Sequence, residues 1–149
     1  MNKEFMYEAI ALAKQTSLTD DVPVGAVVVK NGVVIGRGFN TREAKGDPTA
    51  HAEIVAIRQA SEKLGSWRLD GCELYVTLEP CPMCAGAIIN SRISTVIFGA
   101  YDKKAGSASN DSVINLFSLP YNHAPEVYGG ICEAKCAKLL THFFKDKRP

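Results

Sequence analysis

The sequence has no apolar run long enough to cross a membrane and almost no net charge. Its apolar stretches fall well short of the roughly 18 residues that suggest a transmembrane helix, and charged side chains interrupt the apolar pattern of its first twenty residues. Seventeen basic residues against sixteen acidic ones give a formal charge of +1. We therefore expect a soluble protein with no membrane partner, in which any nucleic-acid ligand is held by a local patch rather than by the field of the whole molecule.

The sequence also lacks the features of a secreted disulfide scaffold and of a repeat protein. It has five cysteines, an odd number, and no apolar core of an export signal near its start. Thiols in such a chain are metal ligands or buried side chains more often than disulfides. We find no internal repeat and no low-complexity segment. These observations favour a reducing, cytoplasmic location.

The length and composition indicate one globular unit. The chain has 149 residues, of which 46% are apolar and 22% are charged. A chain of this size buries roughly 68–70% of its unfolded surface, enough for one substantial core and too little for two independent ones. We expect a single domain over residues 1–149, with the lone tryptophan, Trp67, packed in its core.

The first half of the chain alternates between helical and strand-like patterns. β-branched runs lie on both sides of Asn31-Gly32, which is the strongest short signal for a β-hairpin. Gly65 follows an apolar stripe at helical spacing and predicts a helix end. The expected elements are a helix over 2–17, strands over 22–29 and 33–39, a loop over 40–48 and a helix over 50–64.

The second half predicts a crossover between parallel strands. A strand, a helix and a strand in succession require such a crossover, so the sheet that begins as a hairpin becomes mixed, with helices on both faces. Cys132 and Cys136 belong to a final apolar stripe at helical spacing. The expected elements are a strand over 72–78, helices over 82–90 and 113–119, strands over 95–99 and 126–128, and a loop over 101–112.

Two short motifs hold the residues that could bind a metal. His51 and Glu53 lie in Asp-Pro-Thr-Ala-His-Ala-Glu, and Cys81 and Cys84 lie in Glu-Pro-Cys-Pro-Met-Cys. Both motifs stand where helices are expected to begin, and a helix N-terminus lowers the pKa of a thiol. One histidine and two cysteines give zinc three ligands and leave its fourth position open. That arrangement is typical of a catalytic zinc site rather than a structural one.

Glu53 follows His51 by two residues, so it can reach a water molecule at the metal without being a ligand. Zinc lowers the pKa of a bound water to about 7, and a carboxyl group in this position can carry a proton to a ring nitrogen and then to a departing amine. The fitting reaction is hydrolytic deamination. Zinc deaminases of nucleobases use His-x-Glu and Pro-Cys-x-x-Cys to attack C4 of cytosine or C6 of adenine.

Over nearly its whole length the chain resembles the bacterial tRNA adenosine deaminases, which convert the wobble adenosine to inosine. The stretches that carry the resemblance are His51-Ala52-Glu53, Pro80 to Ala87, Val22 to Ala26, Phe98 to Asp102 and Asn122-His123. The resemblance implies an α/β class fold, the cytidine-deaminase-like three-layer α/β/α sandwich with a mixed five-stranded sheet. It also implies one Zn²⁺ per chain, a homodimer, and a tRNA anticodon loop whose adenosine at position 34 is flipped into the zinc pocket.

The same resemblance implies a set of substrate contacts. Asn40 would hydrogen-bond the base and the Ala52 backbone would help to seat it. Leu78, Ala100 and Asp102 would line the path to the pocket, with His123 toward the RNA. Basic residues that could contact phosphates are Lys103, Lys104, Lys145, Lys147 and Arg148.

Two other functions remain open at this point. A guanine deaminase or another purine deaminase would share both zinc motifs, so the motifs alone do not separate it from the tRNA enzyme. In a non-catalytic zinc-stabilised interaction module, Glu53 would have no function. In that third hypothesis Cys132 and Cys136 could complete a four-cysteine site, although their i, i+4 spacing on an apolar stripe is more typical of buried core thiols.

Overall fold

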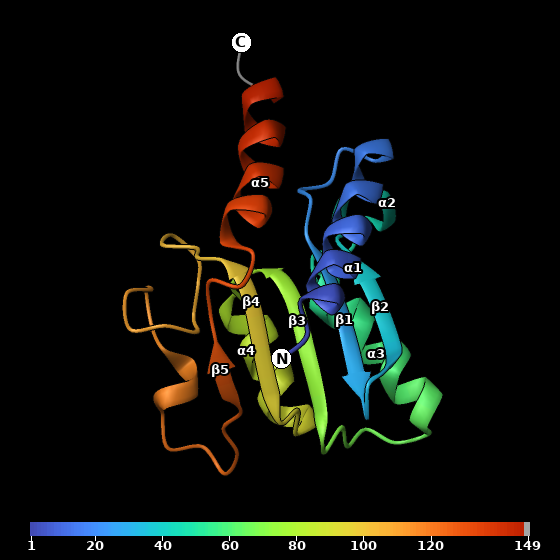
Figure 1. The fold of residues 1–149 in the computed structure, drawn as a ribbon, viewed down its shortest axis with the longest axis vertical. Coiled ribbons are helices and arrows are strands. Elements are labelled where there is room, and N and C mark those ends of the chain that lie inside the picture. The colour runs from blue at the N-terminus through green and yellow to red at the C-terminus, as the bar shows by residue number, and fades with distance from the viewer. Residues whose placement is uncertain (148–149) are drawn as a thin grey trace.

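The structure is a computed structural model that describes residues 1–147, and its centre is one mixed β-sheet with the strand order β2-β1-β3-β4-β5. β1 pairs antiparallel with β2 and β3, whereas β3, β4 and β5 run parallel. The five strands, shown in Figure 1, are β1 (Gly25–Lys30), β2 (Val33–Phe39), β3 (Cys72–Leu78), β4 (Thr95–Ala100) and β5 (Glu126–Tyr128).

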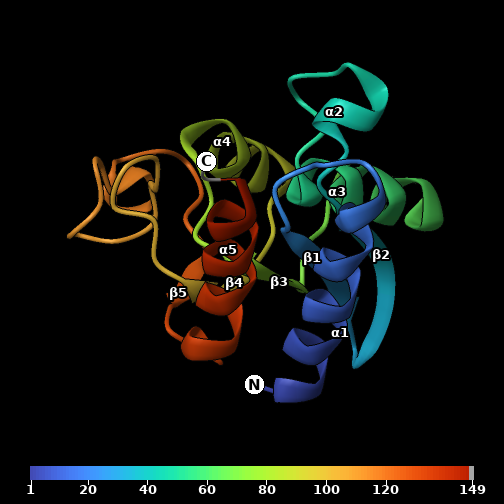
Figure 2. The same cartoon turned by 90° about the horizontal axis from the view of Figure 1, so that it is seen from above.

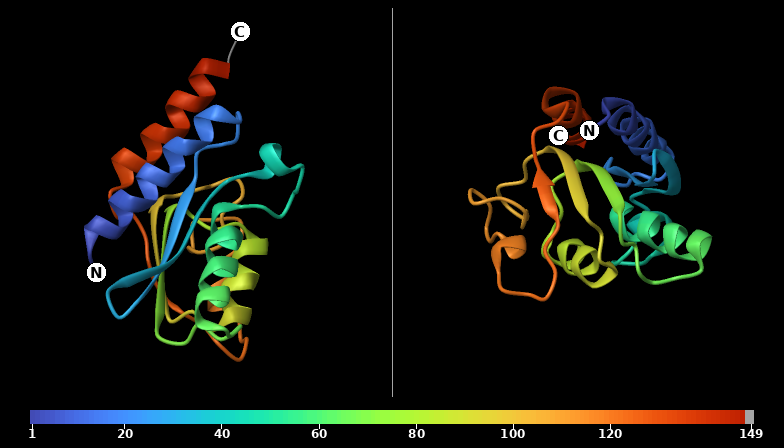
Figure 3. Two further views of the ribbon diagram at one scale, coloured as in Figure 1. Left: turned by 90° about the vertical axis from the view of Figure 1, so that its right-hand side faces the viewer. Right: turned by 60° about the horizontal axis from the view of Figure 1, so that its bottom comes forward.

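Helices cover both faces of the sheet, which confirms the predicted three-layer α/β/α sandwich. One face carries α1 (Lys3–Lys14) and α5 (Glu133–Lys147), and the other carries α3 (Ala52–Leu64) and α4 (Pro82–Ser91), as Figures 2 and 3 show. No helix within residues 1–147 combines the length and the apolar character that crossing a membrane would require. The short elements are α2 (Arg42–Lys45), η1 (Gln15–Leu18) and η2 (Leu116–Ser118).

The predicted hairpin and crossover are both present, and together they give the sheet its mixed character. Asn31 and Gly32 both have positive φ angles, 51° and 77°, as the two central residues of a type I′ turn require. The crossover through α4 places β3 and β4 in parallel register, with Leu78 opposite Ala100. Both strands therefore end at the same edge of the sheet, where α4 begins.

Apolar side chains are buried on both faces of the central strands. Leu74 and Val76 belong to the core under α3 and α4, while Tyr75 belongs to the core under α1 and α5. A strand covered on both faces reads as a continuous apolar run rather than an alternating one. The buried sheet thus positions the residues that follow the ends of its strands.

A glycine on β2 brings the start of α3 close to the sheet. A Cβ atom on Gly38 would lie 2.4 Å from the carbonyl oxygen of Ala52 and 2.7 Å from the amide nitrogen of Ala56. Only a residue without a side chain permits that approach. The position of the first turn of α3 therefore depends on Gly38.

The structure contradicts the expectations for Trp67 and for the loop over 40–48. Trp67 is 59% exposed rather than packed in the core, because it lies in the loop beyond α3, where the guanidinium groups of Arg68 and Arg92 approach its ring. The expected loop over 40–48 contains the short helix α2. The buried Asp21 carboxylate accepts hydrogen bonds from two backbone N–H groups of α2, so this short helix is stabilised by a residue outside it as well as by its C-cap, Gly46.

The predicted helix over 113–119 is a single 3₁₀ turn, and the first strand begins at Gly25 rather than residue 22. Pro23 has no backbone N–H to donate to a neighbouring strand, which explains the later start. The first helix also changes to a 3₁₀ turn at Gln15.

Candidate active site

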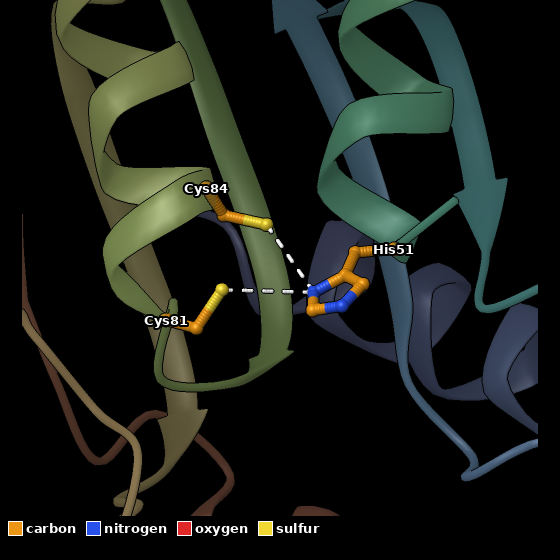
Figure 4. Close-up of side chains that lie close together, drawn as sticks. All are labelled: His51, Cys81 and Cys84. Atoms are coloured by element: carbon orange, nitrogen blue, oxygen red, sulfur yellow. Dashed lines mark hydrogen bonds between the residues drawn. The ribbon is translucent and has the colours of Figure 1, made fainter. Parts of the chain in front are cut away.

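His51, Cys81 and Cys84 come together at the edge of the sheet where β3 and β4 end. Their ligand atoms all lie within 4.8 Å of one another. The Nδ1 atom of His51 is 3.6 Å from the Sγ atoms of both cysteines. Figure 4 shows the three side chains pointing toward one another from α3 and α4. The structure therefore brings together the three residues that the sequence predicted as metal ligands.

These separations fit a tetrahedral zinc ion. With a Zn–S bond of about 2.3 Å and a Zn–N bond of about 2.05 Å, a tetrahedral angle places sulfur and nitrogen about 3.6 Å apart. The donor set of one imidazole and two thiols also suits zinc, and three protein ligands leave one position for water or substrate. The residues present therefore fit the metal that the motifs imply.

The local structure explains why the three side chains meet. His51 is the N-cap residue of α3, and Cys81 is the N-cap residue of α4. Pro82 occupies the first turn of α4, where its missing N–H costs no hydrogen bond. The positive ends of both helix dipoles point at the cluster and favour negative charge on the sulfur atoms.

The protonation of the cluster follows from its short contacts. Hydrogen bonds from Cys84 and His51 lower the pKa of Cys81 to about 4. The pKa of Cys84 is raised, because its thiol donates to Cys81 and because it is buried. The hydrogen bond with Cys81 also raises the pKa of His51. Protons shared among closely spaced ligands are the ones that a divalent cation releases on binding.

Glu53 is 4% exposed and lies on the first turn of α3, two residues after His51. Burial is the main cause that raises the pKa of Glu53 to about 7, and its carboxyl group interacts with the Cys84 thiol. A carboxyl group of this kind can both accept and donate a proton near neutral pH. Its position beside the cluster suits proton transfer rather than metal binding.

Asn40, at the end of β2, is held close to the cluster by the backbone. Its buried side-chain amide donates to Val22 O and accepts from Arg42 N, each at 3.1 Å. The next residue along the chain, Thr41, donates its N–H to the carbonyl of Ala50, the residue before His51. Because an amide NH₂ group has two hydrogens, one donor of Asn40 is available to a substrate.

The remaining expected substrate contacts fall on both sides of the cluster. Ala52 is the first residue of α3, and His51 gives this helix no side-chain cap, so the N–H of Ala52 is available to a ligand. Leu78 and Ala100 face each other at the ends of β3 and β4. Asp102 lies two residues after Ala100, and its side chain accepts hydrogen bonds from the backbone N–H groups of a tight turn.

His123 does not join this group. Its Nε2 atom lies 2.6 Å from the carbonyl oxygen of Ile93, beyond the C-terminal end of α4, whereas Cys81 caps the N-terminal end. The helix has ten residues, and a rise of 1.5 Å per residue separates its ends by about 15 Å. Arg148, an expected phosphate contact, lies outside the described residues.

Cys132 and Cys136 are also remote from the cluster. Cys136 is buried in the core under α1 and α5, on the opposite face of the sheet from α4, and Cys132 packs against that core. The geometry therefore gives no support to a four-cysteine zinc site within residues 1–147.

The sequence gives little indication that Glu79 has a functional role. Its carboxylate is 2% exposed and accepts hydrogen bonds from the segment that follows β4. The only local signal is its place next to Pro80-Cys81, because sequence alone does not distinguish a buried carboxylate from a solvated one.

Comparisons with known proteins agree with this geometry. The sequence matches the MafB19-like deaminase family over residues 1–148. It is 46% identical to the tRNA-specific adenosine deaminase of Bacillus subtilis, with 97% of this chain and 89% of that protein covered. A solved structure from a study of A-to-I editing by tRNA:A34 deaminases matches with a TM-score of 0.89 and 46% identity, over 93% of this chain and all of that one.

A guanine deaminase structure from Bacillus subtilis is also 46% identical, but its TM-score is 0.65 and the match covers 68% of this chain and 66% of that one. The similarity to the tRNA:A34 deaminase structure is therefore more extensive in both coverage and shape. The chain belongs to the tRNA-specific adenosine deaminase family, with its cytidine-deaminase-like fold.

Proposed function

We propose that this chain catalyses the hydrolytic deamination of adenosine to inosine at the wobble position of tRNA, as one zinc-dependent domain over residues 1–149. The observation that carries the proposal is the buried Glu53 carboxyl group beside the cluster of His51, Cys81 and Cys84. A structural zinc site has no need of a buried acid of this kind. The near full-length similarity to tRNA-specific adenosine deaminases supports the choice of substrate.

The reaction exchanges the amine at C6 of the purine for oxygen from water and releases ammonia. His51, Cys81 and Cys84 would hold Zn²⁺, one ion per chain, and that ion would supply Lewis-acid activation of a water molecule. The Glu53 carboxylate takes a proton from the attacking water and delivers it to the ring nitrogen N1. Glu53 then takes the second proton from the hydroxyl group formed at C6 and delivers it to the amine as the C6–N bond breaks. Ammonia leaves, the oxygen stays on C6 as a carbonyl, and Glu53 ends as the carboxylate.

The surroundings of the cluster support an RNA substrate. Lys103 and Lys104 are exposed in the turn that follows Asp102, and Arg42 and Lys45 are exposed on α2, close to the start of α3. Local positive charge of this kind can contact phosphates of an anticodon loop while the net charge of the whole chain stays at +1. We infer that these side chains contact RNA and that the flipped base enters between Asn40 and Asp102.

We also infer a homodimer, acting in the cytoplasm where tRNA is decoded. Met83, on the first turn of α4 between Cys81 and Cys84, is exposed, and so are Val113 and Ile114 before η2. Such surface is typical of protein interfaces. Light scattering should give twice the mass of one chain, and a mass equal to one chain would overturn the dimer.

The test of the function is a deamination assay that compares RNA substrates with free adenosine and free guanine. The purified protein should convert an adenosine-34 anticodon stem-loop to inosine, with little action on a scrambled RNA of the same composition and essentially none on free adenosine. The matched assay with free guanine measures ammonia release. Rapid deamination of guanine without inosine in the stem-loop would replace this proposal with the guanine deaminase alternative.

A further inference from the structure

Glu79 is a buried carboxylate whose hydrogen-bond partners all come from one distant segment. Its Oε1 atom accepts the N–H of Asp102 at 2.9 Å, and its Oε2 atom accepts the N–H of Ala108 at 2.9 Å and the hydroxyl of Ser112. None of the ion pairs found within residues 1–147 includes Glu79. Neutral donors of the segment 102–112 therefore solvate this carboxylate in place of water.

The same segment is bound to the residue that precedes the first cysteine of the cluster. Ser107 is fully buried and donates twice to the carbonyl oxygen of Pro80, from its N–H at 3.0 Å and from its hydroxyl at 2.8 Å. Pro80 is followed directly by Cys81. Hydrogen bonds thus hold the segment 102–112 against the connection between β3 and α4, at the two successive residues Glu79 and Pro80.

The close fit between Glu79 and the segment also explains a glycine. A Cβ atom on Gly106 would lie 2.5 Å from Cδ of Glu79 and 2.4 Å from the carbonyl oxygen of Asp102. Any larger residue at this position would push the segment away from the carboxylate. The path of the backbone through this segment therefore depends on both Gly106 and Glu79.

We propose that Glu79 is a positioning residue. Its carboxylate holds the segment 102–112 in place, so that this segment lines the substrate site beside the cluster. The inference rests on the proposed function for the identity of the substrate. A segment that lines the site contacts the substrate equally in the ground state and in the transition state. Displacement of this segment therefore raises KM and leaves kcat nearly unchanged. Glu79 has no part in the chemical step or in metal binding.

The first test is Glu79→Gln, which keeps the volume and replaces one acceptor by a donor. One of the two backbone N–H groups then faces an NH₂ group and loses its partner. We expect amide hydrogen exchange of Asp102 and Ala108 to become about 10- to 100-fold faster. KM for the anticodon stem-loop should rise about tenfold while kcat stays within about threefold. Zinc content should be unchanged.

Two further variants test the same contact from the other side, so that the inference does not depend on the folding of one protein. Ser112→Ala removes one of the three donors and should shift KM and exchange in the same direction by a smaller factor. Gly106→Ala leaves the carboxylate intact and should reproduce the rise in KM. Glu126→Gln is the matched control. The Glu126 carboxylate is exposed and also accepts a hydrogen bond, from the hydroxyl of Tyr128. This substitution should change none of these quantities.

The outcomes separate this inference from the function it rests on. A lower kcat at unchanged KM, a loss of zinc, or unchanged exchange in Glu79→Gln would each overturn the positioning role. If the native chain forms no inosine, the proposed function fails, and KM is then measured with guanine. Faster exchange with a raised KM for guanine would still support the role of Glu79, and an unchanged KM would overturn it.

Discussion

The Nδ1 atom of His51 lies 3.6 Å from the Sγ atom of Cys84, although 33 residues separate the two in the chain. The two residues belong to the starts of α3 and α4, and their meeting is a tertiary contact. A metal bound between them joins two helices, so that its binding free energy adds to the stability of the fold. If zinc binds there as proposed, stability and activity depend on the same contact.

Replacement of Cys84 by serine should remove the metal. A hydroxyl is a much weaker zinc ligand than a thiolate, so elemental analysis should find about one zinc per native chain and nearly none in Cys84→Ser. Cys132→Ser is the control, because Cys132 lies on the other face of the sheet. Full zinc in the first variant together with loss in the second would show that the ligand set is wrong.

Removal of the metal should lower the melting temperature. A ligand present at about 1,000 times its Kd stabilises a protein by about 4 kcal/mol, which for a chain of this size amounts to roughly 8 °C or more. Thermal unfolding by circular dichroism, before and after chelation, measures the change. Added Zn²⁺ should restore the original Tm and added Mg²⁺ should not. An unchanged Tm after complete loss of zinc would contradict the link between the helices.

Glu53→Gln should abolish most of the turnover and leave the fold intact. The amide has the size of the acid but does not transfer protons, so kcat should fall by roughly 10²–10⁴-fold or more. Zinc content should remain at about one per chain. Glu62→Gln makes the same change at an exposed position of the same helix and should have no effect. Native turnover in Glu53→Gln would rule out the mechanism.

Charge reversal at Lys103 and Lys104 should weaken RNA binding. A lost phosphate contact affects the ground state and the transition state alike, so KM for the stem-loop should rise without a change in kcat. The slope of log KM against log salt should also become shallower. Lys30→Glu with Lys63→Glu is the control, since it reverses the same charge at the opposite end of the sheet. Equal effects of the two pairs would indicate a general electrostatic effect and no local contact.

Gly38→Ala should destabilise the protein, whereas Gly86→Ala should not. The added methyl group at Gly38 would overlap the backbone of α3, and forced packing of this kind typically costs about 1–3 kcal/mol. At Gly86, within α4, a Cβ atom has nothing within 4 Å, so alanine should be neutral or stabilising by up to about 1 kcal/mol. Urea unfolding of both variants measures the difference, and similar midpoints would contradict the close packing of α3 on β2.

Features that depend on neighbouring residues follow from the sequence alone. The turn at Asn31-Gly32 has the positive φ angles that those residues tolerate, and Gly65 ends α3 in the left-handed conformation. Pro82 marks the start of α4. The set of candidate zinc ligands also follows from sequence, because the chemistry of imidazole and thiol side chains depends little on the fold.

Contacts between groups that are far apart in the sequence depend on the tertiary structure. The strand order β2-β1-β3-β4-β5 places the starts of α3 and α4 at one edge and His123 at the other end of α4. Packing across that sheet also determines the burial of Glu53, the exposure of Trp67 and the hydrogen bonds between Glu79 and the segment 102–112. Local patterns carry no information on such contacts, because burial and hydrogen bonding at one residue are set by atoms tens of residues away in the chain.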